Sequence, residues 1–298
     1  MPELPEVETV RRIAAPLVID RSITGITMNP TFTCVLEAPD GMDPVSSLIG
    51  RTIVDVDRRG KYLLFLLDAD LWMVIHLRMT GRLLVVDREA PPVRFEHLGI
   101  ALDNGKDLRF GDQRKFGRVR VTLPEEVEAL SSRLGPEPFD RHVTGRWLHG
   151  ALGRRSGKIK AVLLDQHLLA GLGNIYVDEA LFRARIHPER IARDLSLEEA
   201  KRLIGAIRHV LRSAIHNQGT TFSSFENPYG EAGSNADFLR VYGKGRGALP
   251  CPRCATPLEH LVVGGRGTTF CPRCQLLRGP DTPSAIPAPP SRNDGAPG

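Results

Sequence analysis

Four cysteines near the C-terminal end restrict the fold of this chain more than any other feature of its sequence. They form two matched pairs, Cys251-Pro-Arg-Cys254 and Cys271-Pro-Arg-Cys274, separated by residues 255–270. Four thiolates at this spacing suit one Zn(II) ion in a closed tetrahedral shell, and such an ion contributes to folding. Two redox-active pairs are the alternative, but the matched spacing favours the metal. We therefore predict a structural zinc ribbon that holds one ion per chain.

Composition and charge narrow the class of protein. With 298 residues, of which 41% are hydrophobic, the chain can bury a sizeable core, and its length suggests two domains. A net charge of +5 and a pI near 9.1 fit a polyanionic partner. Cys34 alone lies outside the cysteine pairs, which favours a reducing compartment over a secreted disulfide framework. Since the sequence has neither a signal peptide nor an apolar run of about 18 residues, we expect a cytoplasmic protein without a membrane partner.

The first residues of the chain carry an unusual chemical group. Removal of Met1 before the small Pro2 would leave a secondary amine at the N-terminus. An N-terminal amine has a pKa of about 7.8, so part of it is neutral near pH 7 and can attack an aldehyde-type carbon to form an imine. Pro2 is therefore a candidate nucleophile.

Two glutamates lie close to that amine. The spacing of apolar residues after Pro5 predicts a helix over residues 5–15, with Glu6 near its positive end and Glu3 just outside it. An amine with an adjacent acid could cleave a glycosidic bond. The alternative is that both glutamates only complement the helix dipole, and their spacing alone does not separate the two interpretations.

The segment over residues 2–9, Pro-Glu-Leu-Pro-Glu-Val-Glu-Thr, resembles the N-terminus of the formamidopyrimidine-DNA glycosylase (Fpg/Nei) family of bacteria. In that family, the N-terminal proline forms a Schiff base with the deoxyribose of a damaged nucleotide. The resemblance implies that Pro2 is the nucleophile, that Glu3 supplies a proton to the sugar oxygen, and that Glu6 orients the N-terminal region. It also implies a monomer that binds damaged double-stranded DNA.

Residues 22–123 have the pattern of an antiparallel β-sandwich. Short apolar runs such as 53–57 and 62–67 follow one another between polar turns. Asn104-Gly105 between two apolar runs is a strong hairpin signal. Several strands at short intervals, without the rhythm of parallel βαβ units, favour antiparallel sheets.

Two polar positions in this region match functional positions of the family. Lys61, in Gly-Lys-Tyr, corresponds to a lysine that contacts the backbone of the damaged nucleotide and assists elimination. His76 begins a loop, His-Leu-Arg-Met-Thr-Gly, that resembles a DNA-contacting loop of the family. Taken alone, a lysine at a turn is more often a solvated surface group.

Two loops of the sandwich carry residues that the resemblance assigns to a wedge. Met79 lies in the first loop, and Arg114 and Phe116 lie in Asp-Gln-Arg-Lys-Phe-Gly. Two apolar side chains and a guanidinium would enter the gap left by a flipped base and offset the lost stacking. Without the resemblance, a Met or a Phe at a turn is more often a cap on the core.

Three positions near these loops depart from the family pattern. Arg78 and Gln113 stand where the family usually has a glycine and a proline, so we expect the loop shapes to differ slightly. Phe95 stands where the family has a histidine that touches DNA. A phenyl ring cannot donate that hydrogen bond, so the role is not transferred to Phe95.

The pattern becomes helical after the turn formers at residues 135–138. Helices are predicted over residues 158–166 and 175–184, and another begins at Ser196, where Ser-Leu-Glu-Glu is a capping box. A glycine turn over residues 170–174 joins the first two helices. Its backbone N–H groups at a helix start suit a phosphate.

This region resembles the helix-two-turn-helix DNA-binding element of the family. The resemblance implies that Asn174, Arg155 and Lys160 contact backbone phosphates, which position a duplex without reading its sequence. Residues 219–237 match a loop that closes over the everted base, with Thr220 and Thr221 as candidate contacts, and a disordered surface connection is the alternative.

Arg266 lies between the cysteine pairs, in Gly-Gly-Arg-Gly-Thr. It matches a family arginine at the tip of the zinc hairpin, which contacts phosphates flanking the lesion and supports the second elimination. As a single residue, it would more often be a solvated hairpin arginine.

The motifs occur in the family order from Pro2 to about Gln275, and they imply an α+β fold. We expect an N-terminal antiparallel β-sandwich with the catalytic N-terminal helix, then a helical helix-two-turn-helix domain with a four-cysteine zinc ribbon. The expected boundaries are 1–134 for the sandwich domain, 135–236 for the helical domain with its lesion loop, 237–277 for the zinc ribbon and 278–298 for a disordered tail.

The implied function is DNA repair by base excision. A bifunctional DNA glycosylase and AP lyase would remove oxidised purines such as 8-oxoguanine and formamidopyrimidines, and would cleave the strand by β,δ-elimination. One alternative is a Nei-type glycosylase for oxidised pyrimidines, although the segment over residues 182–188 favours purines. The other is a catalytically inert protein that binds damaged DNA, against which the intact set of Pro2, Glu3, Lys61 and Arg266 argues.

Overall fold

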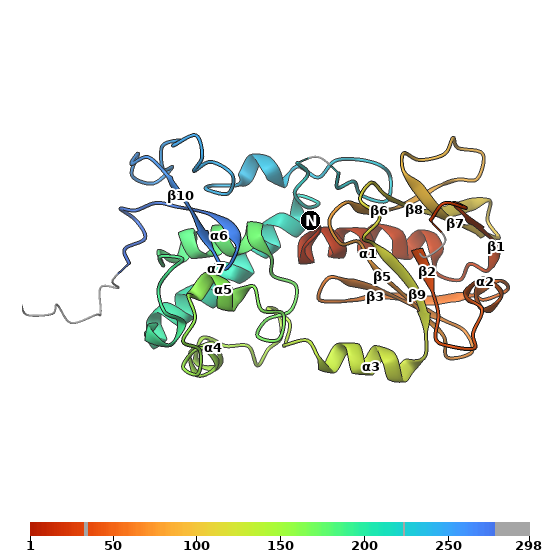
Figure 1. Ribbon diagram of the computed structural model, residues 1–298, viewed down its shortest axis with the longest axis horizontal. Coiled ribbons are helices and arrows are strands. Elements are labelled where there is room, and N and C mark those ends of the chain that lie inside the picture. The colour runs from red at the N-terminus through yellow and green to blue at the C-terminus, as the bar shows by residue number, and fades with distance from the viewer. Residues whose placement is uncertain (33–34, 223, 278–298) are drawn as a thin grey trace, which may run out of the picture.

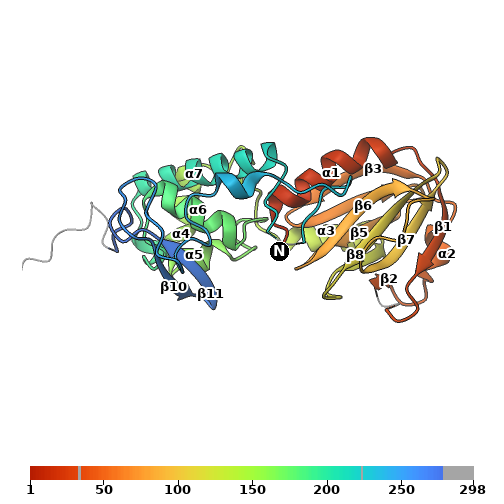
Figure 2. The same ribbon diagram turned by 90° about the horizontal axis from the view of Figure 1, so that it is seen from above.

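The computed structural model describes residues 1–32, 35–222 and 224–277, so Cys34 and the tail expected over residues 278–298 lie outside it. The described chain forms two lobes, and the N-terminus lies between them (Figure 1). One lobe consists mainly of β-sheets and the other mainly of helices (Figure 2). The α+β fold predicted from the sequence is confirmed.

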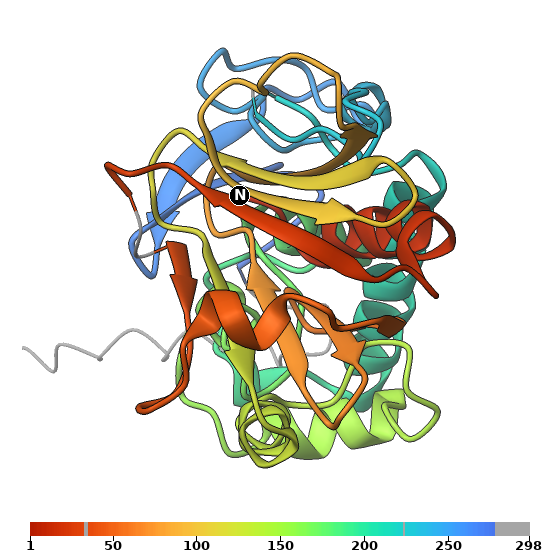
Figure 3. The same ribbon diagram turned by 90° about the vertical axis from the view of Figure 1, so that its right-hand side faces the viewer.

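The first lobe is a β-sandwich of two sheets (Figure 3). The four-stranded sheet has the order β1-β7-β8-β6, and the five-stranded sheet has the order β2-β9-β5-β4-β3. Neighbouring strands pair in antiparallel fashion, except for the short parallel pair β2-β9. The strands are β1 (Ile23–Met28), β2 (Leu36–Glu37), β3 (Ile53–Arg59), β4 (Tyr62–Leu67), β5 (Trp72–His76), β6 (Gly81–Asp87), β7 (Glu96–Leu102), β8 (Lys106–Asp112) and β9 (Arg118–Thr122).

Strand β4 is apolar throughout because both of its faces are covered. Leu63 and Phe65 point into the main core of the sandwich and are fully buried. Leu64, on the opposite face, packs in a smaller cluster with Val127 of helix α3 (Pro124–Ser132). A strand that is buried on both faces needs a continuous apolar run and shows no alternation.

The hairpin predicted at Asn104-Gly105 is confirmed. It joins β7 to β8, and Gly105 has φ +77, in the left-handed region that favours glycine. The turn between β3 and β4 likewise depends on Gly60, at φ +57, and it places Lys61 directly before β4.

The second lobe contains helices and a C-terminal hairpin. The capping box predicted at Ser196 is confirmed, because Ser196 N–H donates to Glu199 Oε2 at 2.9 Å and Glu199 N–H donates to Ser196 Oγ at 3.3 Å. The elements after β9, apart from α3, are α4 (Gly145–Leu152), α5 (Ile159–Leu163), α6 (Asn174–Ala184), η2 (Ala192–Asp194), α7 (Leu197–His216), η3 (Asn235–Phe238), β10 (Glu259–Val263) and β11 (Arg266–Phe270). A short helix of the first lobe, α2, covers Pro44–Leu48.

The helix predicted over residues 158–166 is shorter than expected. Helix α5 ends at Leu163 because Gln166 bonds with the turn that follows. Its amide nitrogen donates to the carbonyl oxygens of Leu164 and Leu172, and its amide oxygen accepts the N–H of Gly171. A side chain that bonds with nearby backbone in this way competes with the helix.

Helix α1 (Leu4–Val18) joins the two lobes. It is longer than the helix predicted over residues 5–15. Its first residue, Leu4, is buried in the core of the helical lobe, whereas Val7 and Val10 are buried in the core of the sandwich. The N-terminus of the chain is therefore fixed where the two lobes meet.

A loop of the helical lobe makes the reciprocal contact. Phe225 is 5% exposed and belongs to the core of the sandwich. The same loop bonds with β6, because Val85 N–H donates to Pro228 O at 2.9 Å and Arg82 pairs with Glu226 at 2.7 Å. Each lobe thus contributes one apolar side chain to the core of the other.

The segment that connects the lobes is held by a charged cluster. The Glu137 carboxylate accepts the N–H of Gly60 at 2.7 Å and an Nη of Arg58 at 2.9 Å, while Arg59 donates to Gly135 O at 2.7 Å. The turn that carries Lys61 is therefore bound to the connection between the lobes. We propose that the domain boundaries follow those expected from the sequence, with the first division beside this cluster at residues 134 and 135.

Among the described helices, none combines the length and the apolar character that crossing a bilayer requires.

Phe225→Ala should lower the free energy of unfolding by about 3 kcal/mol, because truncating a buried phenylalanine leaves a cavity. Chemical denaturation with an equilibrium probe measures the change. Phe238→Ala is the matched control, since Phe238 is 58% exposed and its loss should change the stability by less than about 0.5 kcal/mol. Equal effects of the two substitutions would show that the interlobe contact does not contribute to stability.

Candidate active site

The predicted catalytic residues meet where α1 begins. Pro2 is buried, Met1 in front of it is 44% exposed, and the N–H of Leu4 donates to Gly171 O at 3.0 Å. A small cavity of about 40 Å³ lies beside Pro2, lined also by Ile175, Thr220 and Phe222. Removal of Met1 would place the free amine of Pro2 at this cavity.

The Glu3 carboxylate lies at the start of helix α6. Its oxygens accept the N–H groups of Ile175 at 3.0 Å and Tyr176 at 3.5 Å, so the positive end of the helix faces a buried acid. Burial raises the pKa of Glu3 above its usual range, and the charge of Lys61 opposes this shift. A raised pKa means that the acid holds its proton more strongly than an ordinary glutamate, as a general acid requires.

The glycine turn before α6 brings the chain close to its own N-terminus. A Cβ at Gly173 would lie 2.3 Å from Glu3 Cδ, and a Cβ at Gly171 would lie 2.6 Å from Leu4 Cδ1. The sequence suggested that the N–H groups at this helix start face a phosphate, and this prediction is wrong for Ile175 and Tyr176. Glu3 is their partner.

Glu6 is fixed by three donors. Its Oε2 accepts the N–H of Glu3 at 2.8 Å, and its Oε1 accepts the N–H of Thr220 at 2.8 Å and the hydroxyl of Tyr176 at 2.5 Å. Burial raises the pKa of Glu6 to about 7, and the neighbouring Glu3 charge acts in the same direction. Glu6 thus connects α1, α6 and the loop after α7.

Tyr176 and Thr220 complete this cluster, and the sequence did not predict their contacts. The Tyr176 hydroxyl lies 3.0 Å from Thr220 Oγ1, which also accepts the amide N–H of Asn235 at 2.8 Å. Thr220 was a candidate contact for an everted base, but here its backbone and side chain fix Glu6 and the loop. No local pattern signals these contacts because the partners are far apart in sequence.

Lys61 faces the two glutamates from the sandwich. It is 8% exposed, and burial lowers its pKa below the usual value, while the charges of Glu3 and Glu6 act in the opposite direction. The positive charge of Arg266 also lowers the pKa of Lys61. Arg266 therefore lies close enough for its charge to act on Lys61, although its side chain is exposed. The structure therefore brings Pro2, Glu3, Glu6, Lys61 and Arg266 into one region.

Lys160 does not lie at a surface where a phosphate could bind. It is fully buried, its Nζ pairs with Asp178 at 2.6 Å, and the same Nζ donates to Gly267 O at 2.9 Å. The predicted phosphate contact of Lys160 does not fit this burial. A buried ammonium must be paired, and Lys160 instead joins helix α6 to the β10-β11 hairpin.

The other two predicted phosphate ligands are more accessible. Asn174 is partly buried, and its amide nitrogen donates to Gly267 O at 3.0 Å. Arg155 is partly exposed and pairs with Asp165 at 3.1 Å. Their contacts with DNA stay predictions.

The two loops of the predicted wedge are held together by Asp112. Its carboxylate accepts the N–H groups of Arg114 at 3.1 Å and Phe116 at 2.7 Å, and it also accepts the hydroxyl of Thr80 in the other loop. Asp112 is buried, and the sequence did not predict that it connects the two loops. Met79 is partly buried in the first of these loops.

Phe116 and Phe95 project from the neighbouring loops. Phe116 is 49% exposed, and the guanidinium of Arg114 lies 4.7 Å from its ring centre. Phe95 is 40% exposed, takes φ +57, and is stacked by Arg94 in the same way. An exposed aromatic ring beside a guanidinium suits stacking on nucleic acid.

His76 is held as a neutral donor. Burial lowers its pKa to about 3, with the charges of Arg78 and Lys61 acting in the same direction. Its Nδ1 accepts the N–H of Arg78 at 2.9 Å, so in the neutral ring the proton is on Nε2. Nε2 is therefore available to donate to an acceptor such as a phosphate oxygen.

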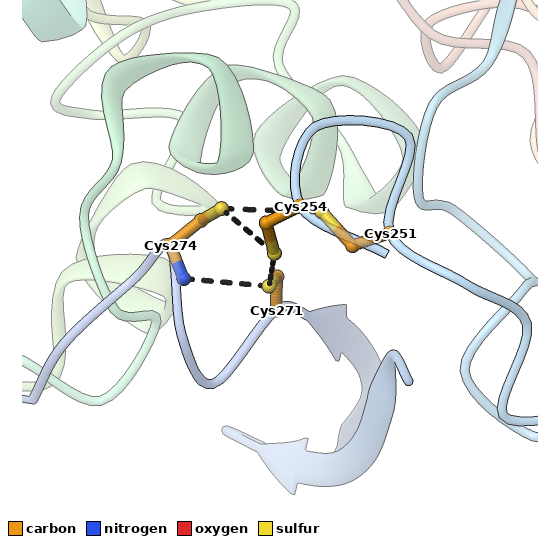
Figure 4. Close-up of side chains that lie close together, drawn as sticks. All are labelled: Cys251, Cys254, Cys271 and Cys274. Carbon is orange, nitrogen blue, oxygen red and sulfur yellow. Dashed lines mark hydrogen bonds between the residues drawn. The ribbon is translucent and has the colours of Figure 1, made fainter. Parts of the chain in front are cut away.

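The four paired cysteines form one cluster (Figure 4). The Sγ atoms of Cys254 and Cys271 are 3.5 Å apart, those of Cys254 and Cys274 are 3.4 Å apart, and those of Cys251 and Cys274 are 4.0 Å apart. A Zn–S bond of about 2.3 Å gives a tetrahedron with edges of about 3.8 Å. The cluster therefore suits one structural zinc ion, as the sequence predicted.

Carboxylates of helix α6 hold the zinc ribbon in place. Glu179 accepts the N–H groups of Arg240, Val241 and Tyr242, and Asp178 accepts the N–H of Thr269 at 3.0 Å. The start of the same helix binds Glu3. Arg266 is thereby positioned relative to the N-terminus through a single helix.

Comparison with known proteins agrees with this arrangement. Residues 1–119 match the formamidopyrimidine-DNA glycosylase N-terminal domain, residues 134–226 match the H2TH domain of the same glycosylases, and residues 248–276 match a zinc finger found in FPG and IleRS. Together these matches cover most of the chain.

Individual relatives match over almost their whole length. A formamidopyrimidine-DNA glycosylase of Chloroflexus aurantiacus is 45% identical over 93% of this chain and 98% of its own. One from Moorella thermoacetica is 46% identical over 88% of this chain and 94% of its own.

Solved structures show the same similarity. The MutM (Fpg) protein of Thermus thermophilus is 41% identical, with a TM-score of 0.80 over 92% of this chain and 98% of its own. The Lactococcus lactis Fpg in complex with DNA containing an abasic site is 35% identical, with a TM-score of 0.81 over 92% of this chain and 99% of its own.

Glu6→Gln should remove a pH dependence of stability. The raised pKa of Glu6 means that the folded protein binds a proton more strongly than the unfolded chain, so this contribution is fully present below pH 4.5 and is lost as the pH rises through about 7. Between pH 5 and pH 8, the wild type should lose about 2–3 kcal/mol relative to the variant. Denaturation at four pH values measures this difference, and parallel curves would contradict the burial of Glu6.

Removal of the metal should weaken both stability and DNA binding. Chelation should cost on the order of several kcal/mol of folding free energy and release the hairpin that carries Arg266. Metal analysis should find one zinc per chain, none after Cys274→Ser, and an unchanged content after Cys34→Ser. Full thermal stability after complete chelation would contradict a structural role for the ion.

Proposed function

Since the chain belongs to the formamidopyrimidine-DNA glycosylase family, and so is a DNA glycosylase of base excision repair, we propose that it is bifunctional. It removes oxidised purines such as 8-oxoguanine and formamidopyrimidines, and then cleaves the strand as an AP lyase. The observation that supports this best is that Pro2, beside a small cavity, is followed by the buried carboxylates of Glu3 and Glu6, and that the buried Lys61 interacts with both of their charges.

The first chemical step uses the amine of Pro2. Its nitrogen attacks C1′ of the damaged nucleotide, and the bond from C1′ to the base breaks. The base leaves with the bonding electron pair and takes up the proton that the Pro2 nitrogen gives up. Glu3 supplies a proton to the ring oxygen of the sugar, so that the ring opens and an iminium forms between Pro2 and C1′. The raised pKa of Glu3 supports this role, since a proton must be present on the acid before the step.

The second stage is elimination. The iminium makes the proton on C2′ acidic, and loss of that proton expels the 3′ phosphate. Loss of the C4′ proton, which the conjugated iminium then makes acidic, expels the 5′ phosphate and leaves a gap of one nucleotide. The lowered pKa of Lys61 supports a part in proton transfer beside the damaged nucleotide. Arg266 is exposed on the hairpin and would stabilise the phosphates that flank the lesion.

The exposed loops would hold the bent duplex. His76 and Asn174 bind phosphates, Arg155 contributes a positive charge, and Met79, Arg114 and Phe116 fill the space left by the everted base. Solved relatives include the Lactococcus lactis Fpg in complex with DNA that contains an abasic site and a mutant of the same protein in complex with DNA that contains Fapy-dG. We infer that this chain acts on damaged duplex DNA as a cytoplasmic monomer without a membrane partner.

The preference for purines separates this proposal from its alternatives. Relatives that match over most of this chain are formamidopyrimidine-DNA glycosylases, and one solved relative is MutM in complex with DNA that contains carbocyclic 8-oxo-G. A Nei-type preference for oxidised pyrimidines is the competing substrate class. An inert binder of damaged DNA is the competing class of protein.

Borohydride trapping on a duplex with one 8-oxoguanine opposite cytosine tests the proposal. Protein verified to begin at Pro2 should give a covalent adduct, and Pro2→Gly should reduce the amount at least tenfold. Pro5→Gly is the control, since Pro5 is also buried in the first turn but carries no free amine. An adduct found only on an oxidised-pyrimidine duplex would support the Nei-type alternative, and binding without any adduct would support the inert binder.

A further inference from the structure

The loop after β5 contains a residue in an unfavourable backbone conformation. Arg78 has φ +54, in the left-handed region where glycine is favoured. Its side chain is exposed and gains no compensating packing in the core. Strain of this kind persists where the surrounding structure imposes it, and it gathers at functional sites. The side chain of Arg78 must therefore supply an interaction that a glycine at this position could not make.

Arg78 lines a cavity in which arginines outnumber carboxylates. The cavity has a volume of about 450 Å³ between the five-stranded sheet and α3, and its lining includes His76, Arg118, Arg120 and Arg133. Arg118 pairs with Glu37 at 2.9 Å, and Arg120 pairs with Glu126 at 2.9 Å. Within residues 1–32, 35–222 and 224–277, neither Arg78 nor Arg133 forms an ion pair. The lining therefore keeps two uncompensated positive charges.

His76 places a second donor at the same edge of the cavity. The backbone N–H of Arg78 is bonded to Nδ1 of His76 at 2.9 Å, so the loop fixes the imidazole and leaves Nε2–H available. A guanidinium and a neutral N–H donor from residues that line the same cavity match the oxygens of a phosphodiester, and a guanidinium can bind two of them.

We propose that Arg78, with His76 and the basic cavity beside them, forms a further subsite that binds one backbone phosphate of the DNA duplex. This inference rests on the proposed function, since it requires a duplex on this face of the sandwich. The contact is independent of the lesion and of base sequence because it is made to the backbone. The unfavourable backbone conformation of Arg78 would then persist because it places a positive charge beside the DNA strand.

A pair of matched substitutions tests this subsite. Arg78→Gly and Arg185→Gly each remove one arginine from a position of nearly equal φ, +54 and +59. Arg185 is exposed at the far end of helix α6, about 16 Å along the helix from Asn174. Both substitutions should relieve strain, so the Tm of each should rise by about 1–3 °C.

Only Arg78→Gly should weaken DNA binding. Its affinity for an undamaged duplex should fall several-fold, and the slope of log K against log salt should decrease in magnitude by about 0.9, the value for one phosphate contact. Arg185→Gly should leave both quantities unchanged. A higher Tm with unchanged affinity and salt slope for Arg78→Gly would overturn the proposal, as would equal losses of affinity in the two variants.

The choice of duplex and one further measurement separate this inference from other outcomes. Because an undamaged duplex is used, the result does not depend on whether Pro2 forms an imine, and failed trapping can be recognised separately. Inorganic phosphate is tested alone by thermal shift. If phosphate stabilises the wild type but not Arg78→Gly while their duplex affinities are equal, the cavity is a site for a free anion and the duplex subsite is excluded.

Discussion

Two carboxylates buried where the lobes meet are the interactions on which the rest of this structure depends. Glu3 and Glu6 are almost inaccessible to solvent, and a buried carboxylate is costly unless donors surround it. The helical lobe supplies backbone N–H groups at the start of α6, the N–H of Thr220, and the hydroxyl of Tyr176. Lys61 adds a positive charge from the sandwich. The catalytic environment therefore forms only when the lobes are docked, and the exchange of Leu4 and Phe225 between their cores supports that docking.

The site consists of buried carboxylates that are fixed by hydrogen bonds and of exposed side chains on the surrounding loops. Glu3 and Glu6 are buried and fixed by hydrogen bonds, whereas Arg114 and Phe116, which are assigned to DNA, are exposed on a loop. These loops are nevertheless defined, since Asp112 binds the backbone of the segment that carries Arg114 and Phe116. A surface that must fit a bent duplex benefits from side chains that can adjust on a fixed backbone.

Helix α6 forms hydrogen bonds with segments near both ends of the chain. Its first turn binds Glu3, and further along it Asp178 and Glu179 bind the segments that form the zinc ribbon. Lys160 balances the negative charge of Asp178 through an ion pair, and it donates a hydrogen bond to the hairpin at Gly267 O. The zinc ion would complete this unit by fixing the cysteine loops, so that a structural metal far from the reacting atoms helps to position Arg266.

Local patterns in the sequence were enough to predict the strands of the sandwich, the Asn104-Gly105 hairpin, the Ser196 capping box and the cysteine cluster, because each depends on residues that are close in the chain. The residues that gather around Pro2 could be named only through their resemblance to a family. What each side chain touches was decided by the tertiary structure. Tyr176 and Thr220 lie 170 and 214 residues from Glu6, and the burial of Lys160 depends on a hairpin 107 residues away. Such contacts leave no periodic signal in the sequence, since burial and hydrogen bonding between distant segments exist only once the two lobes have packed together.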